Sequence, residues 1–286
     1  MSKVSSIFIV GPTASGKTEL AINIAKYFNG EIICADSRTV YRGLNIGTAK
    51  PTRQEQAEIK HYGLDLINPN ETFSAADFQR SAKVWMKDIK AKNKLPIIVG
   101  GSGLYIDSLL FEFDFGAPAD SALRQKLENS EISELQQIII TEGIEMPEND
   151  KNRRYLIRAI EQGGINRRRG QLMSGAVVIG IDPGQEVLDK RILQRTDKIR
   201  QAGVVEEAAW LFESYGYDAP AAAAPFYKAL RPHFQSGADL DDCFRQASLN
   251  DRRLAKRQRT WFKRNPAIEW HESPAAAERA LRVFLG

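Results

Sequence analysis

The chain has 286 residues, which suits one large domain or one core with an attached lobe. Its 43% of hydrophobic and 27% of charged residues are values of an ordinary globular protein. No apolar run is long enough to span a membrane and no N-terminal signal is visible, so we expect a cytoplasmic protein. The two cysteines and three histidines lack metal-ligand spacing, which argues against a zinc site.

The positive charges are unevenly distributed, although the net charge is only +4. Residues 252–264 hold many basic side chains and no acidic one, and residues 153–158 and 167–169 hold smaller basic clusters. Such concentrated basic faces suit a polyanion, while an ordinary solvated surface is the alternative explanation.

The first predicted elements are a buried strand at residues 7–10 and a helix with apolar residues at helical spacing over residues 20–28. The loop between them fits the phosphate-binding pattern G-x-x-x-x-G-K-[ST]. Its residues are Gly11, Pro12, Thr13, Ala14, Ser15, Gly16, Lys17 and Thr18.

Each residue type in this loop has a chemical reason. Gly11 and Gly16 let the backbone turn tightly, so that N–H groups can point at phosphate oxygens. Lys17 adds a positive charge, and the hydroxyl of Thr18 is a hard oxygen ligand suited to Mg²⁺. The helix adds the positive end of its dipole. We therefore expect residues 11–18 to bind a phosphate group, with Mg²⁺ on Thr18.

A second buried strand is predicted at residues 31–35, and it ends at Asp36. In an open parallel sheet, ligands gather at the carboxyl ends of the strands, so Asp36 is expected on the same functional edge as the phosphate-binding loop. A third strand is predicted at residues 64–67, followed by a helix that Ser74 can cap.

The next predicted strand, residues 96–99, leads into a glycine-rich turn at residues 100–105. Gly101 and Ser102 are expected to approach a ligand, because they emerge at the same edge of the sheet. Gly103 is expected to serve only the tight turn into a helix.

The rest of the chain is less regular, with short helical signals in residues 116–175, strand character at residues 176–181 and a mainly helical C-terminal part. A break at residues 219–225 is interpreted as a mobile loop. We predict an α/β fold with a P-loop NTPase-like parallel sheet. Its core would comprise residues 1–115 and 176–286, and residues 116–175 would form a mainly helical insertion.

Two longer stretches extend beyond a phosphate-binding loop. Residues 36–51 read DSRTVYRGLNIGTAKP, and residues 254–262 read LAKRQRTWF. Together with residues 11–18 and 100–105, and in the same order over nearly the whole chain, they resemble the tRNA dimethylallyltransferases, also called isopentenyl-tRNA transferases.

The resemblance implies transfer of a dimethylallyl group from its diphosphate to the exocyclic amine of the adenosine 3′ of the anticodon. Asp36 would be the general base, because an adenine amine is a poor nucleophile and benefits from losing its proton as the bond forms. Lys17, the loop amides and Mg²⁺ on Thr18 would stabilise the leaving diphosphate, and no ATP would be consumed. A helix cap and an Mg²⁺ ligand of a kinase are the alternatives for Asp36.

The resemblance also implies further residue roles. Arg195 matches an arginine near the active-site channel and joins Asp36, Lys17 and Thr18 as an expected catalytic residue. Ser102 stands where the family has a channel-gating residue, usually Thr. The expected tRNA-binding residues are Asp36, Ser37, Arg38, Thr39, Ser102, Arg124, Arg154, Arg158, Lys256 and Arg257. The expected partners are the anticodon loop of tRNA and dimethylallyl diphosphate, with the protein as a monomer.

The sequence departs from the family pattern in two places. Residues 226–229 read FYKA where the family usually has Gly-Tyr-Lys/Arg-Glu, and the segment 125–150 is short. The zinc-finger extension of eukaryotic members is absent, which fits a bacterial type. These differences concern substrate range and turnover more than the reaction class.

Three other functions remain open at this point. A small-molecule or nucleotide kinase would share the loop and the sheet, and an isopentenyltransferase could act on free adenine nucleotides. Neither has a use for the basic residues 252–264. An RNA-binding protein with a vestigial site is the third, against which the intact residues 11–18 and Asp36 count.

Overall fold

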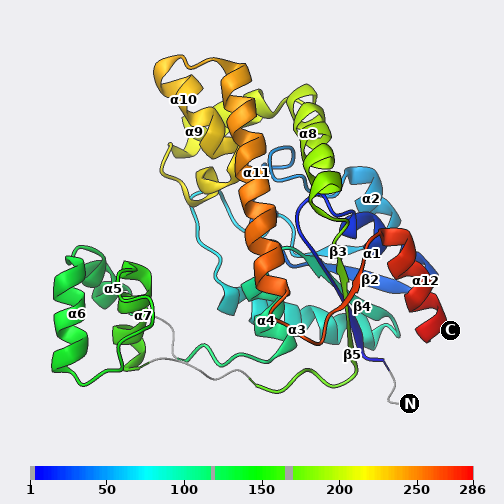
Figure 1. Cartoon of the computed structure of the whole chain (residues 1–286), viewed down its shortest axis with the longest axis horizontal. Coiled ribbons are helices and arrows are strands. Elements are labelled where there is room, and N and C mark those ends of the chain that lie inside the picture. Colours follow the sequence, from blue (N-terminus) through cyan, green and yellow to red (C-terminus); the bar gives the residue numbers. More distant parts are fainter. Residues whose placement is uncertain (1–3, 117–119, 165–169, 286) are drawn as a thin grey trace. The chain divides into compact units, whose positions relative to one another are not determined.

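The computed structural model describes residues 4–116, 120–164 and 170–285 (Figure 1). The chain divides into two compact units, which are described separately. The first, here called the core unit, comprises Met1–Leu110 and Met173–Gly286. The second, here called the inserted unit, comprises Phe111–Leu172.

The core unit is built on a six-stranded sheet with the strand order β3-β2-β4-β1-β5-β6, in which all neighbouring strands are parallel. In β1, Phe8 stands opposite Ile98 of β4 and Val178 of β5. Such central strands are continuously apolar because helices cover both of their faces. The strands are β1 (Ser6–Val10), β2 (Gly30–Cys34), β3 (His61–Tyr62), β4 (Leu95–Gly100), β5 (Ala176–Ile181) and β6 (Glu269–His271).

Helices from both ends of the chain cover the sheet. On one face, α1 (Lys17–Tyr27) and α12 (Pro274–Leu285) bury Leu20 and Leu281 against the sheet. On the other, α3 (Ala75–Ala91) contacts β2 and β4 and packs against α4 (Gly103–Leu110). Ser74 caps α3 as predicted, since its Oγ accepts the N–H of Asp77 (3.2 Å).

The C-terminal part of the core unit is mainly helical, as predicted (Figure 1), and it also contains the strand β6, which the sequence did not predict. Phe226, Tyr227 and Phe244 form a second apolar cluster there, and Val40 and Leu44 belong to the same cluster. The segment that follows Asp36 therefore packs against these helices. The remaining helices of the core unit are α2 (Arg53–Glu58), α8 (Gln185–Gln201), α9 (Val204–Tyr215), η1 (Pro220–Ala223), α10 (Pro225–Ser236) and α11 (Leu240–Phe262).

The third strand lies earlier in the chain than the sequence predicts. β3 comprises only His61 and Tyr62, and residues 64–67 lie beyond it. Gly63, at a φ of 84°, turns the chain at the carbonyl of Cys34. The following residues pair instead with the segment after Asp36, as in the hydrogen bond from the N–H of Leu66 to the carbonyl of Val40 (2.7 Å). The prediction of a strand at residues 64–67 is thus wrong.

Residues 219–225 are packed, whereas the sequence predicts a mobile loop. They contain the short helix η1, and Ala221 and Ala224 are buried in the same cluster as Phe226. The prolines at both ends do interrupt the helical pattern, but the alanines between them fill space that larger side chains could not. The composition of residues 219–225 predicts that the helical pattern is interrupted, but it does not predict that the segment is packed.

The inserted unit is mainly helical in its described part, with α5 (Ser121–Glu128), α6 (Ile132–Thr141) and α7 (Arg153–Gln162). Leu135, Ile139 and Leu156 are fully buried in an apolar cluster of its own. The basic cluster noted at residues 167–169 lies outside the described residues. In the part of the chain that the structure describes, no helix combines the length and apolar character needed to cross a membrane.

Candidate active site

The loop between β1 and α1 has the conformation that its motif requires. Gly16 has a φ of 93°, and a Cβ there would lie 2.7 Å from Cγ of Pro274, so both backbone and space demand glycine. The Lys17 ammonium donates to the carbonyl of Pro12 (2.9 Å). Ser15 Oγ is buried and has no hydrogen-bond partner among the described residues. A buried hydroxyl of this kind suits a ligand oxygen.

Two arginines of α8 reach this loop. Arg191 Nη1 donates to the carbonyl of Ser15 (3.0 Å), and Arg195 Nη1 donates to Thr13 Oγ1. Arg195 also pairs with Asp251 of α11, with 2.9 Å between Nη1 and Oδ2. Burial raises the pKa of Asp251, and the charge of Arg195 opposes this. A buried carboxylate therefore fixes Arg195 beside the phosphate-binding loop.

The pKa of Lys17 depends on its burial and on the charged groups around it. Burial lowers its pKa from 10.5 to about 8. The charge of Asp36 is the next influence and raises this pKa, Arg195 lowers it, and Asp251 raises it. The structure therefore brings Lys17, Asp36 and Arg195 into one electrostatic site, together with Asp251, to which the sequence gave no role.

Asp36 begins the turn that follows β2. Its Oδ1 accepts the N–H of Arg38 (2.8 Å), while its Oδ2 accepts no hydrogen bond from the described residues. The N–H of Ser37 donates to Ser102 Oγ (3.0 Å), which joins this turn to the glycine-rich turn after β4. The fixed carboxylate retains one oxygen that can accept a proton.

The two following side chains of this turn face inward. Arg38 is half-buried, and its Nη1 donates to the carbonyl of Pro220 (3.4 Å). Thr39 is buried, and its hydroxyl donates to the carbonyl of Asp36 (3.4 Å). Their protein contacts thus support the Asp36 turn.

Gln258 of α11 connects the two loops of the site. Its Oε1 accepts the N–H of Thr13 (2.8 Å), and its Nε2 donates to the carbonyl of Gly101 (3.0 Å). A Cβ on Gly101 would lie 2.2 Å from this Nε2, so the side chain that closely approaches Gly101 is Gln258. At Gly103, the space is filled by the ring of Trp261. Gln258 belongs to the motif at residues 254–262, but the sequence alone did not indicate that its side chain connects the two loops.

The basic residues 252–264 on α11 fall into two groups. Arg252 pairs with Asp189 (3.1 Å), and Arg259 pairs with Asp182 (3.1 Å), both through Nε. Lys256 and Arg257 are exposed, and within the described residues their side chains have no ion-pair or hydrogen-bond partner. Only part of this basic run is therefore unneutralised.

The predicted tRNA-binding arginines of the inserted unit differ in the same way. Arg124 makes a bidentate pair with the buried Glu161 (2.7 and 3.0 Å), and Arg158 contacts the same carboxylate (3.3 Å). Arg154 is exposed and has no side-chain partner among the residues the structure describes. Arg124 and Arg158 are structural ion-pair members in this unit, whereas Arg154 faces solvent.

A parallel sheet whose first strand leads into a glycine-rich loop with a lysine, opposed by a carboxylate at the end of β2, defines an enzyme of the P-loop class. A family model described as IPP transferase matches residues 39–265. The chain belongs to this family, as the sequence predicts. The predicted P-loop-like α/β fold is confirmed as well.

Curated relatives and solved structures agree with this assignment. The tRNA dimethylallyltransferase of Streptococcus equi subsp. equi (strain 4047) is 42% identical, with 94% of this chain and 92% of that protein covered. That of Streptococcus thermophilus (strain CNRZ 1066) is 40% identical over 99% and 97%. The tRNA isopentenylpyrophosphate transferase of Bacillus halodurans has a crystal structure with a TM-score of 0.76, 31% identity and coverage of 99% and 97%. The prediction of a tRNA dimethylallyltransferase, a prenyltransferase, is confirmed over the kinase alternative.

Proposed function

We propose that the prenyl donor is dimethylallyl diphosphate and that the acceptor is the exocyclic amine of the adenosine 3′ of the tRNA anticodon. The observation that carries this proposal is that Gln258 and Ser102 connect the phosphate-binding loop, which Lys17 and Arg195 contact, to the turn that carries Asp36. A diphosphate leaves readily where cations meet its growing charge, and a weakly nucleophilic amine reacts better beside a base. This site holds groups for both tasks.

The reaction then assigns one role to each group. The adenine N6 attacks C1 of the dimethylallyl group, and a new C–N bond forms as the bond from C1 to the diphosphate oxygen breaks. Asp36 accepts the proton that the amine loses. Lys17, Arg195 and the backbone N–H groups of the phosphate-binding loop that have no partner within the protein stabilise the negative charge on the departing diphosphate. The products are N6-isopentenyladenosine, diphosphate and a proton.

We propose that Mg²⁺ is bound with the diphosphate and not by the protein alone. Among the described residues, no group of three or more His, Cys, Asp or Glu side chains could hold a metal ion. Thr18 offers a hydroxyl without a hydrogen-bond partner in the described structure, and Ser15 Oγ of the same loop is buried and also has none among the described residues. One hydroxyl plus substrate phosphates and water is a donor set that Mg²⁺ accepts. When bound there, the ion would neutralise charge on the diphosphate oxygens.

The Mg²⁺ proposal can be tested without measuring turnover. Calorimetry should show that wild-type protein binds inorganic pyrophosphate more tightly with Mg²⁺ than without it. Thr18→Val should lose most of this dependence, while Thr52→Val, a helix-capping residue outside the loop, should retain it. Equal Mg²⁺ dependence in all three proteins would contradict a role for Thr18.

For tRNA, we propose contacts from Ser37, Arg38 and Ser102 around Asp36, and from Lys256 and Arg257 on α11. The buried Thr39 would act on tRNA binding only by supporting the turn at Asp36. In the inserted unit, Arg154 is the most accessible of the proposed contacts Arg124, Arg154 and Arg158. Unstacking a base from the anticodon loop costs a few kcal/mol, which phosphate contacts must offset. We further propose that the protein is cytoplasmic and monomeric. Light scattering of the purified enzyme would test the monomeric state.

The main test compares the wild-type protein with Asp36→Asn. Labelled dimethylallyl diphosphate and unmodified tRNA should give labelled tRNA with the wild-type enzyme. The variant should bind pyrophosphate and tRNA normally but react about two to four orders of magnitude more slowly, the usual contribution of a general base. Near-normal turnover of the variant would show that Asp36 is not the base. If the wild-type enzyme labelled added AMP instead of tRNA, its acceptor would be a free nucleotide.

A further inference from the structure

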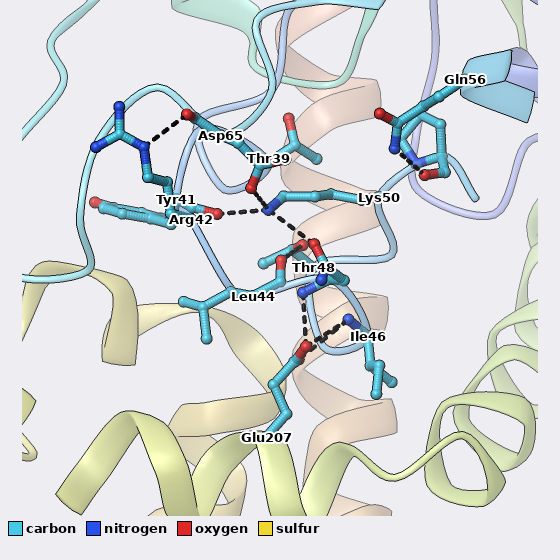
Figure 2. Close-up of polar contacts among 12 residues, drawn as sticks. Thr39, Tyr41, Arg42, Leu44, Ile46, Thr48, Lys50, Gln56, Asp65 and Glu207 are labelled. Atoms are coloured by element: carbon cyan, nitrogen blue, oxygen red, sulfur yellow. Dashed lines mark hydrogen bonds and ion pairs between the residues drawn. The ribbon is translucent and has the colours of Figure 1, made fainter. Parts of the chain in front are cut away.

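The segment from Asp36 to Lys50 is fixed by a carboxylate from another part of the core unit. Three consecutive backbone N–H groups, those of Asn45, Ile46 and Gly47, donate to the carboxylate of Glu207 on α9 (Figure 2). The distances are 2.6 Å from Asn45 to Oε2, 2.9 Å from Ile46 to Oε2 and 2.8 Å from Gly47 to Oε1. Successive amides in this arrangement form a concave anion site, and Glu207 fills it.

Tyr227 of α10 completes the environment of this carboxylate. Its hydroxyl donates to Oε1 of Glu207 (2.6 Å). Burial raises the pKa of Tyr227, and the adjacent negative charge of Glu207 raises it further. The phenol therefore stays a donor at all physiological pH values. Hydrogen bonds to an ionised acceptor are stronger than neutral ones, so this contact holds the segment firmly.

Lys50 fixes the other end of the same segment (Figure 2). Its ammonium donates to the carbonyl of Tyr41 (2.5 Å), to Asn45 Oδ1 (3.1 Å) and to Asp65 Oδ1 (2.6 Å). Only 1% of the Lys50 side chain is exposed, and all three of its N–H groups are used. The segment is therefore closed on itself and held to α9 at its tip.

The beginning of the segment carries the reacting-centre carboxylate. The N–H of Ala35 donates to the carbonyl of Val99 (2.7 Å), which fixes the end of β2 to the sheet. From there the chain runs through Asp36 to the tip that Glu207 holds. Asp36 thus lies on a segment that is anchored to the sheet at one end and to α9 at the other.

We propose that Glu207 is a positioning residue, which sets the geometry of Asp36 by holding the tip of the segment at residues 45–47. It acts through the backbone and touches no reacting atom. The inference rests on the proposed role of Asp36 as the base. It predicts that Glu207 affects turnover without affecting the phosphate-binding loop, which belongs to β1 and α1.

The test compares Glu207→Gln with Glu206→Gln. Glutamine keeps the size of glutamate but replaces one acceptor oxygen by an NH₂ group, which would face N–H donors at the tip. Glu206 is the matched control, because it is an exposed neighbour on the same helix and makes no hydrogen bond to the described segment. Glu207→Gln should lower kcat for tRNA about 10- to 100-fold, the range that small misplacements of a reacting group produce.

Three further measurements separate positioning from general destabilisation. In Glu207→Gln, pyrophosphate affinity should stay within about two-fold of wild type, and amide hydrogen exchange should accelerate at residues 45–47. In Glu207→Ala, added acetate should restore part of kcat by occupying the amides, and it should not affect Glu206→Ala. If a Glu207 variant fails to fold, Tyr227→Phe removes only one hydrogen bond and should show a smaller change in the same direction.

The outcomes are decisive in both directions. Wild-type kcat in Glu207→Gln despite faster exchange at residues 45–47 overturns the inference, as does a parallel loss of kcat, pyrophosphate binding and thermal stability. Failure of the Asp36 assignment is distinguishable, because an active Asp36→Asn enzyme would show it whatever Glu207→Gln does. If Asp36→Asn is inactive and Glu207→Gln is fully active, the positioning role alone is wrong.

Discussion

Removing the charge of Asp251 should weaken diphosphate binding, and the loss should grow with pH. Asp251→Asn keeps an acceptor oxygen for Arg195 but loses the carboxylate, whose side chain is 2% exposed while that of Arg195 is 24% exposed. Without this carboxylate, Arg195 is no longer held in place, and loss of one charge-assisted hydrogen bond from Arg195 to the diphosphate costs at most about 1.5–3 kcal/mol. That corresponds to an affinity for pyrophosphate that is weaker by up to about 10- to 150-fold.

The pH dependence follows from Lys17, whose pKa is about 8 in the wild-type protein. An ammonium binds an anion in its charged form, so its contribution is full below this pKa and disappears as the pH rises through it. The negative charge of Asp251 raises the pKa of Lys17, so Asp251→Asn should lower it. Calorimetric affinity should therefore begin to fall at a lower pH in the variant.

Lys17→Arg is the control for the ligand's own titration, because a guanidinium stays charged over the whole range. Any fall that persists in this variant belongs to pyrophosphate or to other groups. This prediction is refuted if Asp251→Asn matches the wild type both in its affinity for pyrophosphate and in the pH at which that affinity falls. A uniform loss with an unchanged pH profile would mean that Asp251 acts only by orienting Arg195.

The remaining predictions concern three other parts of the core unit. Burial alone would raise the pKa of Glu31, but hydrogen bonds from Lys94, Lys92 and Tyr62 hold it at about 2. Glu31→Gln should therefore cost about 1–2 kcal/mol in urea unfolding at neutral pH. The difference should shrink as the pH falls from 4.5 towards about 2, because a depressed pKa stabilises fully above the unfolded pKa and loses this effect towards the folded one. Gln258→Ala should lower kcat/KM about 30-fold, since two hydrogen bonds worth about 2 kcal/mol together are lost. Unchanged kinetics would show that this connection between the two loops does not affect the reaction. Arg257→Ala should reduce the slope of log tRNA affinity against log salt concentration by about one. Arg252→Ala should leave this slope unchanged, because Arg252 is paired with Asp189. Equal slopes for the wild type and both variants would mean that this face of the helix does not contact RNA.

The parts of the site that could be predicted from sequence are those written in contiguous residues. The phosphate-binding loop requires glycine, lysine and a hydroxyl at fixed spacing, and each requirement arises within a few residues. Asp36 could be placed because strand ends in a parallel sheet share an edge. The apolar strands and the capped helix after Ser74 were predictable for the same local reasons.

The parts that could not be predicted depend on pairing across the chain. The sequence has no local sign that Asp251 meets Arg195 or that Glu207 meets the amides of residues 45–47. The strand predicted at residues 64–67 is wrong for a similar reason, since Leu66 pairs with Val40 instead of extending the sheet. In each case the partner is defined by the packing of distant elements, which apolar periodicity does not encode.

The helix α11 shows how one contiguous motif can serve both substrates. Asp251, Ala255 and Gln258 follow helical spacing on its inner side, where Asp251 holds Arg195 and Gln258 holds Thr13. Lys256 and Arg257 are exposed on the same helix, where they could contact an RNA backbone. Because these positions share one rigid helix, the residues that we propose to bind RNA and the residues that hold the phosphate-binding loop cannot move independently. This explains why exposed basic side chains and a half-buried glutamine stand next to one another in residues 254–262, although their contacts have different chemistry.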